Sequence, residues 1–264
     1  MGVHSMKFGV CCGFEMAELL EKIGFDYIEG NVTVISSMDD GEFNAVAEKM
    51  DSLKIRCEAS CCLFPGELKV VGTDAEMGKI ADYLDKAFAR LERLGVESVV
   101  FGSGGARRIP EGFDRARAWH QLVQVGRLLS EKAGEHGLKI ALEPLNRGET
   151  NIINTQREGL ELVADVDRPN FRILTDYYHV YLENDTREDI AACKGLLQHC
   201  HVVNPVGRIC MTEADNVPYD HFFGGLADCG YTGRISFEGA INNAEAELPV
   251  SLKVMKALAE KHGL

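Results

Sequence analysis

Short runs of β-branched and apolar residues alternate along this chain with longer stretches in which apolar positions recur every three or four residues. The short runs are typical of buried strands, and the longer stretches are typical of amphipathic helices. Eight strands are expected, at Lys7–Cys11, Tyr27–Gly30, Ile55–Ser60, Ser98–Gly102, Lys139–Glu143, Phe171–Asp176, Gln198–Val203 and Arg234–Glu238. Helices are expected at Phe14–Ile23, Asp74–Leu94, Asp114–His136, Gln156–Val166, Asp189–Leu197 and Pro249–His262.

Helices that alternate regularly with strands indicate a parallel sheet, because each parallel connection must cross back over the sheet. Glycines at positions 24, 95 and 137 follow the predicted helices, as residues that end helices often do. Eight strand–helix units are typical of a closed barrel rather than an open sheet. The pattern therefore predicts an α/β protein with one (β/α)₈ TIM barrel, a single domain over residues 1–264.

Composition narrows the classes of partner. The formal net charge of −13 argues against a nucleic acid or an anionic membrane surface. No apolar stretch approaches the roughly 20 residues that span a bilayer, and the N-terminus lacks the apolar segment of a signal peptide. The 9 cysteines have no zinc-finger spacing, which indicates reduced thiols. We expect a cytoplasmic protein; whether Met1–Ser5 is part of the natural chain is left open.

Four polar residues close four consecutive predicted strands: Glu143, Asp176, His201 and Glu238. In a parallel barrel the carboxyl ends of the strands meet at one mouth, where active sites lie. Strand alternation places all four side chains in the lumen while their neighbours face the helices. A ligand set of three carboxylates and one imidazole suits Mn²⁺, Mg²⁺ or Co²⁺ better than it suits the metals that prefer thiolate ligands. The pattern predicts a divalent-metal site.

The same residues carry a family resemblance. The matching segments are Leu142–Thr155 (LEPLNRGETNIINT), Thr175–His179 (TDYYH), His199–Asn204 (HCHVVN) and Phe237–Gly239 (FEG). They resemble the xylose isomerase-like TIM barrels, the sugar isomerase and epimerase superfamily, and most closely the D-tagatose/D-psicose 3-epimerases. The resemblance covers most of the chain in element order, although only Leu138–Gly239 contains specific motifs.

The resemblance implies a set of roles. The four strand-end residues would be the metal ligands, with Mn²⁺ the most expected ion and Mg²⁺, Co²⁺ or Zn²⁺ also compatible. Glu149, His179 and Arg208 would bind the substrate, a small sugar. We also expect a homo-oligomer, either a dimer or a tetramer.

Enolisation of a sugar requires removal of a proton from a carbon beside a carbonyl. A divalent ion that bridges the sugar oxygens acts as a Lewis acid. Glu143 and Glu238 could then act as base and acid on opposite faces of C3, which epimerises a free ketose such as fructose, psicose or tagatose through an enediolate. If the proton moves instead between C1 and C2, the same residues give aldose–ketose isomerisation.

Three alternative functions differ from this one in the residues that they require. A hydroxypyruvate or aldose isomerase of the same superfamily is favoured by the Pro205–Arg208 loop, which resembles that of hydroxypyruvate isomerases. A phosphodiesterase like endonuclease IV needs further His and Asp ligands, yet the segment after Arg208 (ICMTEADNV) has no Asp-x-His pair. A non-catalytic sugar-binding barrel would not require the complete ligand set.

Several other residues have two interpretations. Glu29 would hold the ligand shell or the sugar, or form a salt bridge at the mouth, and His199 would be a core or supporting histidine. His179 is expected to be exposed, because it lies past a strand end. Gly102–Gly105 is interpreted as a tight loop rather than a phosphate cradle, and the Arg107–Arg108 pair as a solvated turn.

Overall fold

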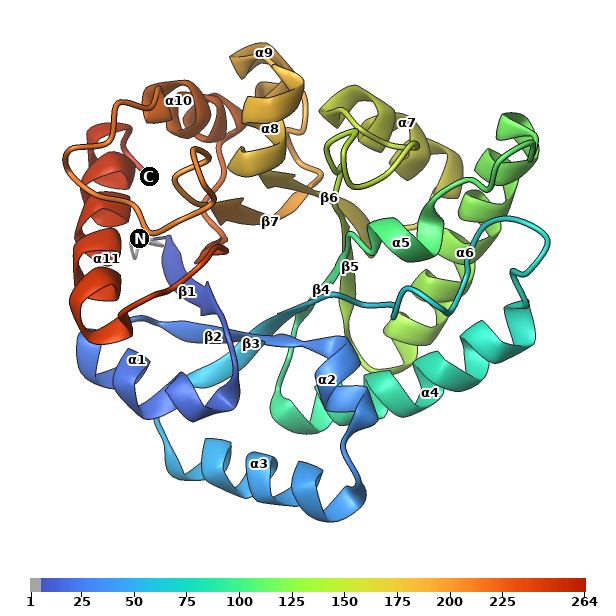
Figure 1. Ribbon diagram of the computed structural model, residues 1–264, viewed down its shortest axis with the longest axis horizontal. Coiled ribbons are helices and arrows are strands. Elements are labelled where there is room, and N and C mark those ends of the chain that lie inside the picture. The colour runs from blue at the N-terminus through green and yellow to red at the C-terminus, as the bar shows by residue number, and fades with distance from the viewer. Residues whose placement is uncertain (1–5) are drawn as a thin grey trace.

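The computed structural model describes residues 6–264, so Met1–Ser5 lie outside the described residues. Eight parallel strands pair in sequence order and close into a barrel, as the periodicity predicts (Figure 1). The strands are β1 (Lys7–Cys11), β2 (Tyr27–Asn31), β3 (Arg56–Cys61), β4 (Ser98–Phe101), β5 (Lys139–Leu142), β6 (Phe171–Asp176), β7 (Leu197–Val202) and β8 (Arg234–Phe237). Pairing of β1 with β8 closes the barrel. The predicted TIM barrel is confirmed.

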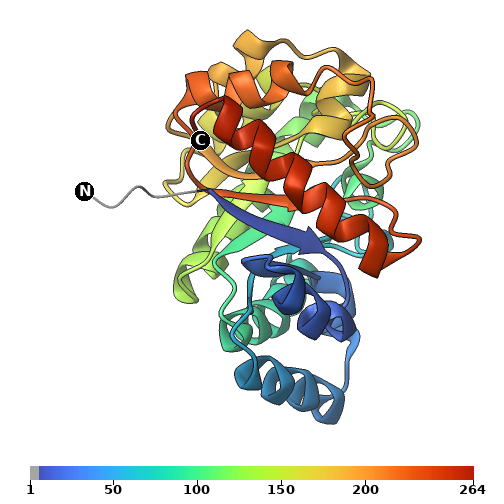
Figure 2. The same ribbon diagram turned by 90° about the vertical axis from the view of Figure 1, so that its left-hand side faces the viewer.

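Helices surround the barrel, and α11 lies beside β1, close to α1 and α10 (Figures 1 and 2). They are the 3₁₀ turn η1 (Phe14–Met16) and α1 (Ala17–Ile23), α2 (Val32–Ser37), α3 (Asp40–Ser52), α4 (Met77–Leu94), α5 (Gly104–Arg107), α6 (Arg115–Glu135), α7 (Gln156–Val166), α8 (Tyr177–Glu183), α9 (Arg187–Ala191), α10 (Tyr219–Cys229) and α11 (Ala244–Lys261). Among residues 6–264, no helix combines the length and the apolar character needed to cross a membrane.

Two predicted helices differ from the structure. The helix expected at Asp189–Leu197 is wrong, because α9 ends at Ala191 and Leu197 already begins β7. Gly195, in the turn between α9 and β7, has a φ of 78°, a left-handed conformation that a helix running to Leu197 could not contain. The final helix begins before the predicted Pro249, at Ala244, where the preceding Asn243 side chain accepts from the Ala246 amide.

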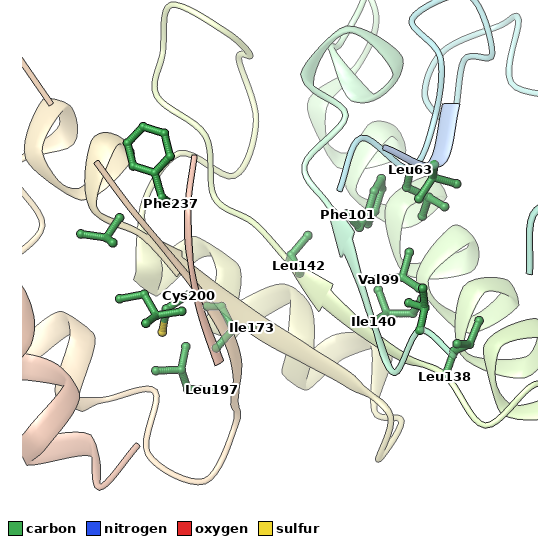
Figure 3. Close-up of a cluster of buried hydrophobic side chains, with 14 of the residues drawn as sticks. Leu63, Val99, Phe101, Leu138, Ile140, Leu142, Ile173, Leu197, Cys200 and Phe237 are labelled. Atoms are coloured by element: carbon green, nitrogen blue, oxygen red, sulfur yellow. The ribbon is translucent and has the colours of Figure 1, made fainter. Parts of the chain in front are cut away.

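The main core lies between the barrel wall and the helices. Figure 3 shows outward-facing strand side chains in this layer, among them Val99, Phe101, Ile140 and Phe237. A much smaller cluster consists of Cys61, Val100, Ala141 and Leu174, with Cys11 packed against it. Polar side chains lie beside this cluster, since the sulfur atoms of Cys11 and Cys61 lie within 4.8 Å of a Glu29 carboxylate oxygen.

Arg107 is buried, so its interpretation as part of a solvated turn is wrong. Its guanidinium donates to the carbonyl oxygens of Phe101 at 3.2 Å, Glu143 at 2.7 Å and Ile153 at 3.4 Å. Burial lowers the Arg107 pKa to about 10, which still leaves the group charged at neutral pH. Arg107 thus ties the ends of β4 and β5 to the loop that follows β5.

We predict that Arg107→Met lowers the free energy of unfolding by about 2–5 kcal/mol, because buried carbonyls lose a charged donor. The matched control is Arg108→Met, at an exposed side chain with one long hydrogen bond, which should change it by less than about 0.5 kcal/mol. Urea unfolding followed by Trp119 fluorescence measures both variants. Equal losses would contradict the structural role of Arg107.

Candidate active site

The four strand-end residues converge at the mouth of the barrel. One ligand-type atom from each of Glu143, Asp176, His201 and Glu238 lies within 4.8 Å of the others. The Nδ1 of His201 is 3.3 Å from the Oε1 of Glu143 and 3.4 Å from the Oε2 of Glu238. The structure therefore brings together all four residues that the sequence predicts as ligands.

Local backbone contacts explain this placement. Glu143 and Glu238 each follow the last residue of a strand, and their amides continue the ladder to the carbonyls of Phe101 and Val202. Asp176 ends β6 and also caps α8, since its Oδ1 accepts from the Tyr178 amide at 2.8 Å. The cap directs the other oxygen of Asp176 toward the site.

Among residues 6–264, three of the converging atoms are buried and have no hydrogen-bond partner: the Oε1 of Glu143, the Oδ2 of Asp176 and the Nδ1 of His201. Buried polar atoms are almost always paired, so three orphaned atoms in one place require an explanation. Two carboxylate oxygens and an imidazole nitrogen are common ligands of divalent cations. With Glu238, this group fits a metal ion.

The electrostatics of the site agree with that fit. Burial, reinforced by Glu238 and Glu143, raises the pKa of Asp176 to about 8. Burial also raises the pKa of Glu143. Burial acts against ionisation at Glu238 too, but His201 and Arg208 outweigh it and lower its pKa to about 2. Three carboxylates packed this closely repel one another, and a cation relieves that repulsion.

Glu29 lies directly behind His201. Its buried carboxylate is 3.1 Å from the Nε2 of His201, 2.7 Å from the Nε2 of His199 and 2.5 Å from the Oγ of Ser236. An Nε2–H that donates to Glu29 leaves the Nδ1 of His201 free to bind a metal. These contacts fit both interpretations, because the Glu29 carboxylate is within ion-pair distance of both imidazoles and also contacts the proposed ligand His201.

His179 is 2% exposed, so the expected exposure is wrong. It is the third residue of α8, which turns the side chain back into the mouth. Its Nδ1 accepts from the Asn146 amide at 3.0 Å, and its Nε2 is 3.4 Å from the Oδ2 of Asp176. Burial, with a contribution from Arg208, lowers its pKa to about 3, so neutral His179 carries an Nε2–H that faces the site.

Arg208 reaches across the mouth from the loop after β7. Its guanidinium contacts the Oε2 of Glu238 at 2.6 Å and the Oε1 of Glu149 at 3.3 Å, and it stacks on the Tyr178 ring at 4.5 Å. A cavity of about 260 Å³ lies beneath it, lined in part by Glu143, Glu149, His179 and Arg208. All three predicted substrate-binding residues therefore border one compartment next to the ligand group.

The loop after β4 forms the other wall of this compartment. A Cβ added at Gly102 would lie 2.2 Å from the Oε2 of Glu143, and one at Gly104 would lie 2.9 Å from the Glu149 carbonyl oxygen. Glycine is needed at both positions because the loop approaches the two glutamates so closely. Of the predicted loop Gly102–Gly105, only Gly102 and Ser103 lie between β4 and α5, because Gly104 and Gly105 begin the short helix α5.

Comparisons with known proteins agree with this architecture. The model of the xylose isomerase-like TIM barrel family matches residues 17–258. An L-ribulose 3-epimerase from Methylomonas sp. (strain DH-1) is 30% identical over 224 residues, which cover 82% of this chain and 74% of that protein. A D-psicose 3-epimerase from Agrobacterium fabrum is 24% identical over 243 residues, which cover 89% of this chain and 80% of that protein.

The fold also matches solved structures. The crystal structure of a D-allulose 3-epimerase from Methylomonas sp. superposes with a TM-score of 0.84 at 23% identity, covering 96% of this chain and 98% of that one. At this identity the match supports the fold rather than the chemistry. The family resemblance inferred from the strand-end motifs is confirmed.

We predict that Asp176→Asn weakens Mn²⁺ binding by more than the roughly 10–100-fold typical of a residue that only supports a ligand. The reason is that the orphaned Oδ2 becomes a neutral amide atom. Isothermal titration of metal-stripped protein measures this, with Asp185→Asn, a buried carboxylate elsewhere, as the matched control. Parental affinity in Asp176→Asn would refute the ligand assignment.

We further predict that Glu29→Gln weakens Mn²⁺ binding by about 10–100-fold, because the two histidines lose a charged acceptor. The surface variant Glu48→Gln should bind like the parent, since Glu48 is exposed. The same titration compares the two. If a correctly folded Glu29→Gln protein keeps its full affinity, Glu29 does not orient His201.

Proposed function

Because this chain belongs to the xylose isomerase-like TIM barrel family and is an enzyme of the isomerase class, we propose that it is a divalent-metal-dependent ketose 3-epimerase. One observation carries the proposal. The carboxylates of Glu143 and Glu238 come from β5 and β8 and approach the same imidazole nitrogen of His201, at 3.3 and 3.4 Å. Two carboxylates around one centre can serve both faces of a substrate carbon.

Glu143, Asp176, His201 and Glu238 would hold the cation, and Mn²⁺ suits this oxygen-rich set best. When bound, the cation supplies Lewis-acid stabilisation of negative charge on the sugar oxygens. Burial of the group supports this role, because water is largely kept away from the ligand atoms and electrostatic interactions there are stronger.

Proton transfer falls to the two glutamates. One carboxylate removes the proton from C3 on one face, and the other, in its protonated form, returns a proton to the opposite face. The product is the C3 epimer, reached through an enediolate. Because the two side chains belong to strands on different sides of the mouth, neither needs to move across the sugar.

Three further side chains would hold the carbonyl end of the ketose. Neutral His179 presents an Nε2–H, Arg208 presents guanidinium donors, and Glu149 presents a carboxylate acceptor. All three line the 260 Å³ compartment that also contains Glu143. Their positions would fix which carbon lies between the two catalytic carboxylates.

A cytoplasmic location, a homo-oligomeric state and a single domain over residues 1–264 remain predictions from the sequence.

We predict that turnover in D₂O places deuterium at C3 of a ketose and that the labelled product has the inverted configuration at C3. Nuclear magnetic resonance of a panel containing fructose, psicose and tagatose locates the label, and metal-stripped protein is the control. Label at C1 or C2 alone would make the protein an aldose–ketose isomerase. No label from any sugar would refute the enolising mechanism.

We predict that Glu238→Gln, at saturating metal, lowers kcat by about 100-fold or more, as loss of a proton-transfer group does. Glu149→Gln should instead act mainly on KM, as loss of a binding contact does. Steady-state kinetics separates the two effects. Near-parental kcat in Glu238→Gln would rule out the two-carboxylate mechanism.

A further inference from the structure

A second and larger cavity, the apolar chamber, opens on the other side of Arg208. Its volume is about 910 Å³, and most of the surface that it exposes is carbon and sulfur. The apolar side chains of its wall come from the loop after β1, the α2–α3 region and the mouth of β3, together with Ala240 after β8. They include Cys12, Phe14, Val34, Met38, Val46 and Cys62.

The apolar chamber adjoins the catalytic compartment. Both cavities are bordered by Cys61, Cys62, Arg208 and Glu238. Glu143, Glu149 and His179 border only the smaller one. A ligand whose reacting carbon lies between the two catalytic glutamates can therefore extend from the polar compartment into the apolar chamber.

The two volumes suit different groups. Cavities of roughly 300–1,000 Å³ typically enclose drug-sized molecules, so 910 Å³ lies near the top of that range, while 260 Å³ lies below it. The smaller compartment suits one end of a sugar. The apolar chamber has room for much more than the three remaining carbons of a hexose.

The chemistry of the wall selects an apolar occupant. Sugar hydroxyls that leave water need hydrogen-bond partners, and most of the surface of this wall offers none. Of the charged side chains in the wall, Glu15 is exposed and Lys49 is half-buried. Val34 is 51% exposed, so an apolar group that covers it removes carbon surface from water. The sulfur atoms of Cys12, Met38 and Cys62 favour contact with an aromatic ring.

We propose that the apolar chamber binds an aromatic group carried by the ketose at the end remote from its carbonyl. The proposal rests on the proposed function, because it places C3 between Glu143 and Glu238. The carbonyl end then faces Glu149, His179 and Arg208, and the C4–C6 end points toward the apolar chamber. An aryl or aralkyl ether at C6 represents this substrate class.

The test compares D-fructose, 6-O-benzyl-D-fructose and 1-O-benzyl-D-fructose in the deuterium-exchange assay with Mn²⁺-loaded protein. The 6-O-benzyl compound should have a kcat/KM about tenfold or more above that of D-fructose, mainly through KM, since a ring of this size is buried. The 1-O-benzyl isomer places the same ring in the small polar compartment and should show no gain. A gain for both isomers, or for neither, overturns the proposal.

A variant that fills part of the apolar chamber tests whether the preference for the 6-O-benzyl compound arises there. Val34→Trp should abolish the advantage of the 6-O-benzyl compound and leave D-fructose exchange unchanged. The matched control is Val250→Trp, since Val250 is 40% exposed on α11 and does not border the apolar chamber. A benzyl advantage that survives Val34→Trp but not Val250→Trp would place the aromatic site elsewhere and overturn the assignment.

Failure of the proposal can be distinguished from failure of the proposed function. Calorimetric binding of 6-O-benzyl-D-glucitol, which has no carbonyl, tests the apolar chamber without turnover. Binding that is lost in Val34→Trp, with no exchange from any ketose, supports the apolar chamber and refutes the epimerase. If D-fructose exchanges deuterium, but the benzyl compound is not preferred and the benzyl glucitol does not bind, the proposed epimerase activity stands and the proposed aromatic site is wrong.

Discussion

The structure depends on holding three carboxylates and one imidazole together away from water. Glu143, Asp176 and Glu238 crowd around His201 at the barrel mouth, and each buried charge without full pairing costs several kcal/mol. The nearest cationic side chain is Arg208, which pairs closely with Glu238 and lies 3.8 Å from Asp176. Within the part of the chain that the structure describes, three ligand atoms have no hydrogen-bond partner, and a divalent cation would balance the negative charge of the carboxylates.

The rest of the mouth fixes these unfavourable groups in place. Arg107 holds the Glu143 carbonyl from below, and the Asp176 side chain is fixed by its role as the cap of α8. Glu29 supports His201 through the nitrogen that faces away from the site. The extensive core between barrel and helices, shown in Figure 3, supplies hydrophobic stabilisation that offsets the strain of the mouth. Catalytic geometry and global stability thus come from different layers of the same strands.

The sequence predicts those parts of the site that follow from strand periodicity. Four polar residues in phase at four strand ends must share the mouth of a closed barrel, so the ligand group could be predicted. The Glu29–His201 contact joins residues 172 positions apart, and strand periodicity gives no signal of which mouth residues touch. Burial of His179 depends on the short helix α8, which begins immediately at the end of β6 and was not expected. Arg107 is a charged residue in a predicted loop, which favours an exposed position. Its burial depends on three backbone carbonyls that come together only in the folded barrel.

The two cavities at the mouth are lined by different parts of the chain, so the residues proposed for catalysis and those proposed for substrate specificity are largely separate in the sequence. The proposed ligands and proton-transfer residues lie at the ends of β5 to β8, where all the specific motifs lie. Most walls of the apolar chamber come instead from β1 to β3 and from α2 and α3. Substitutions in the first part of the chain can therefore reshape the distal end of the site without moving a ligand. This independence ends at three residues. Glu29 borders the apolar chamber and contacts His201, while Arg208 and Glu238 each border both cavities and contact each other.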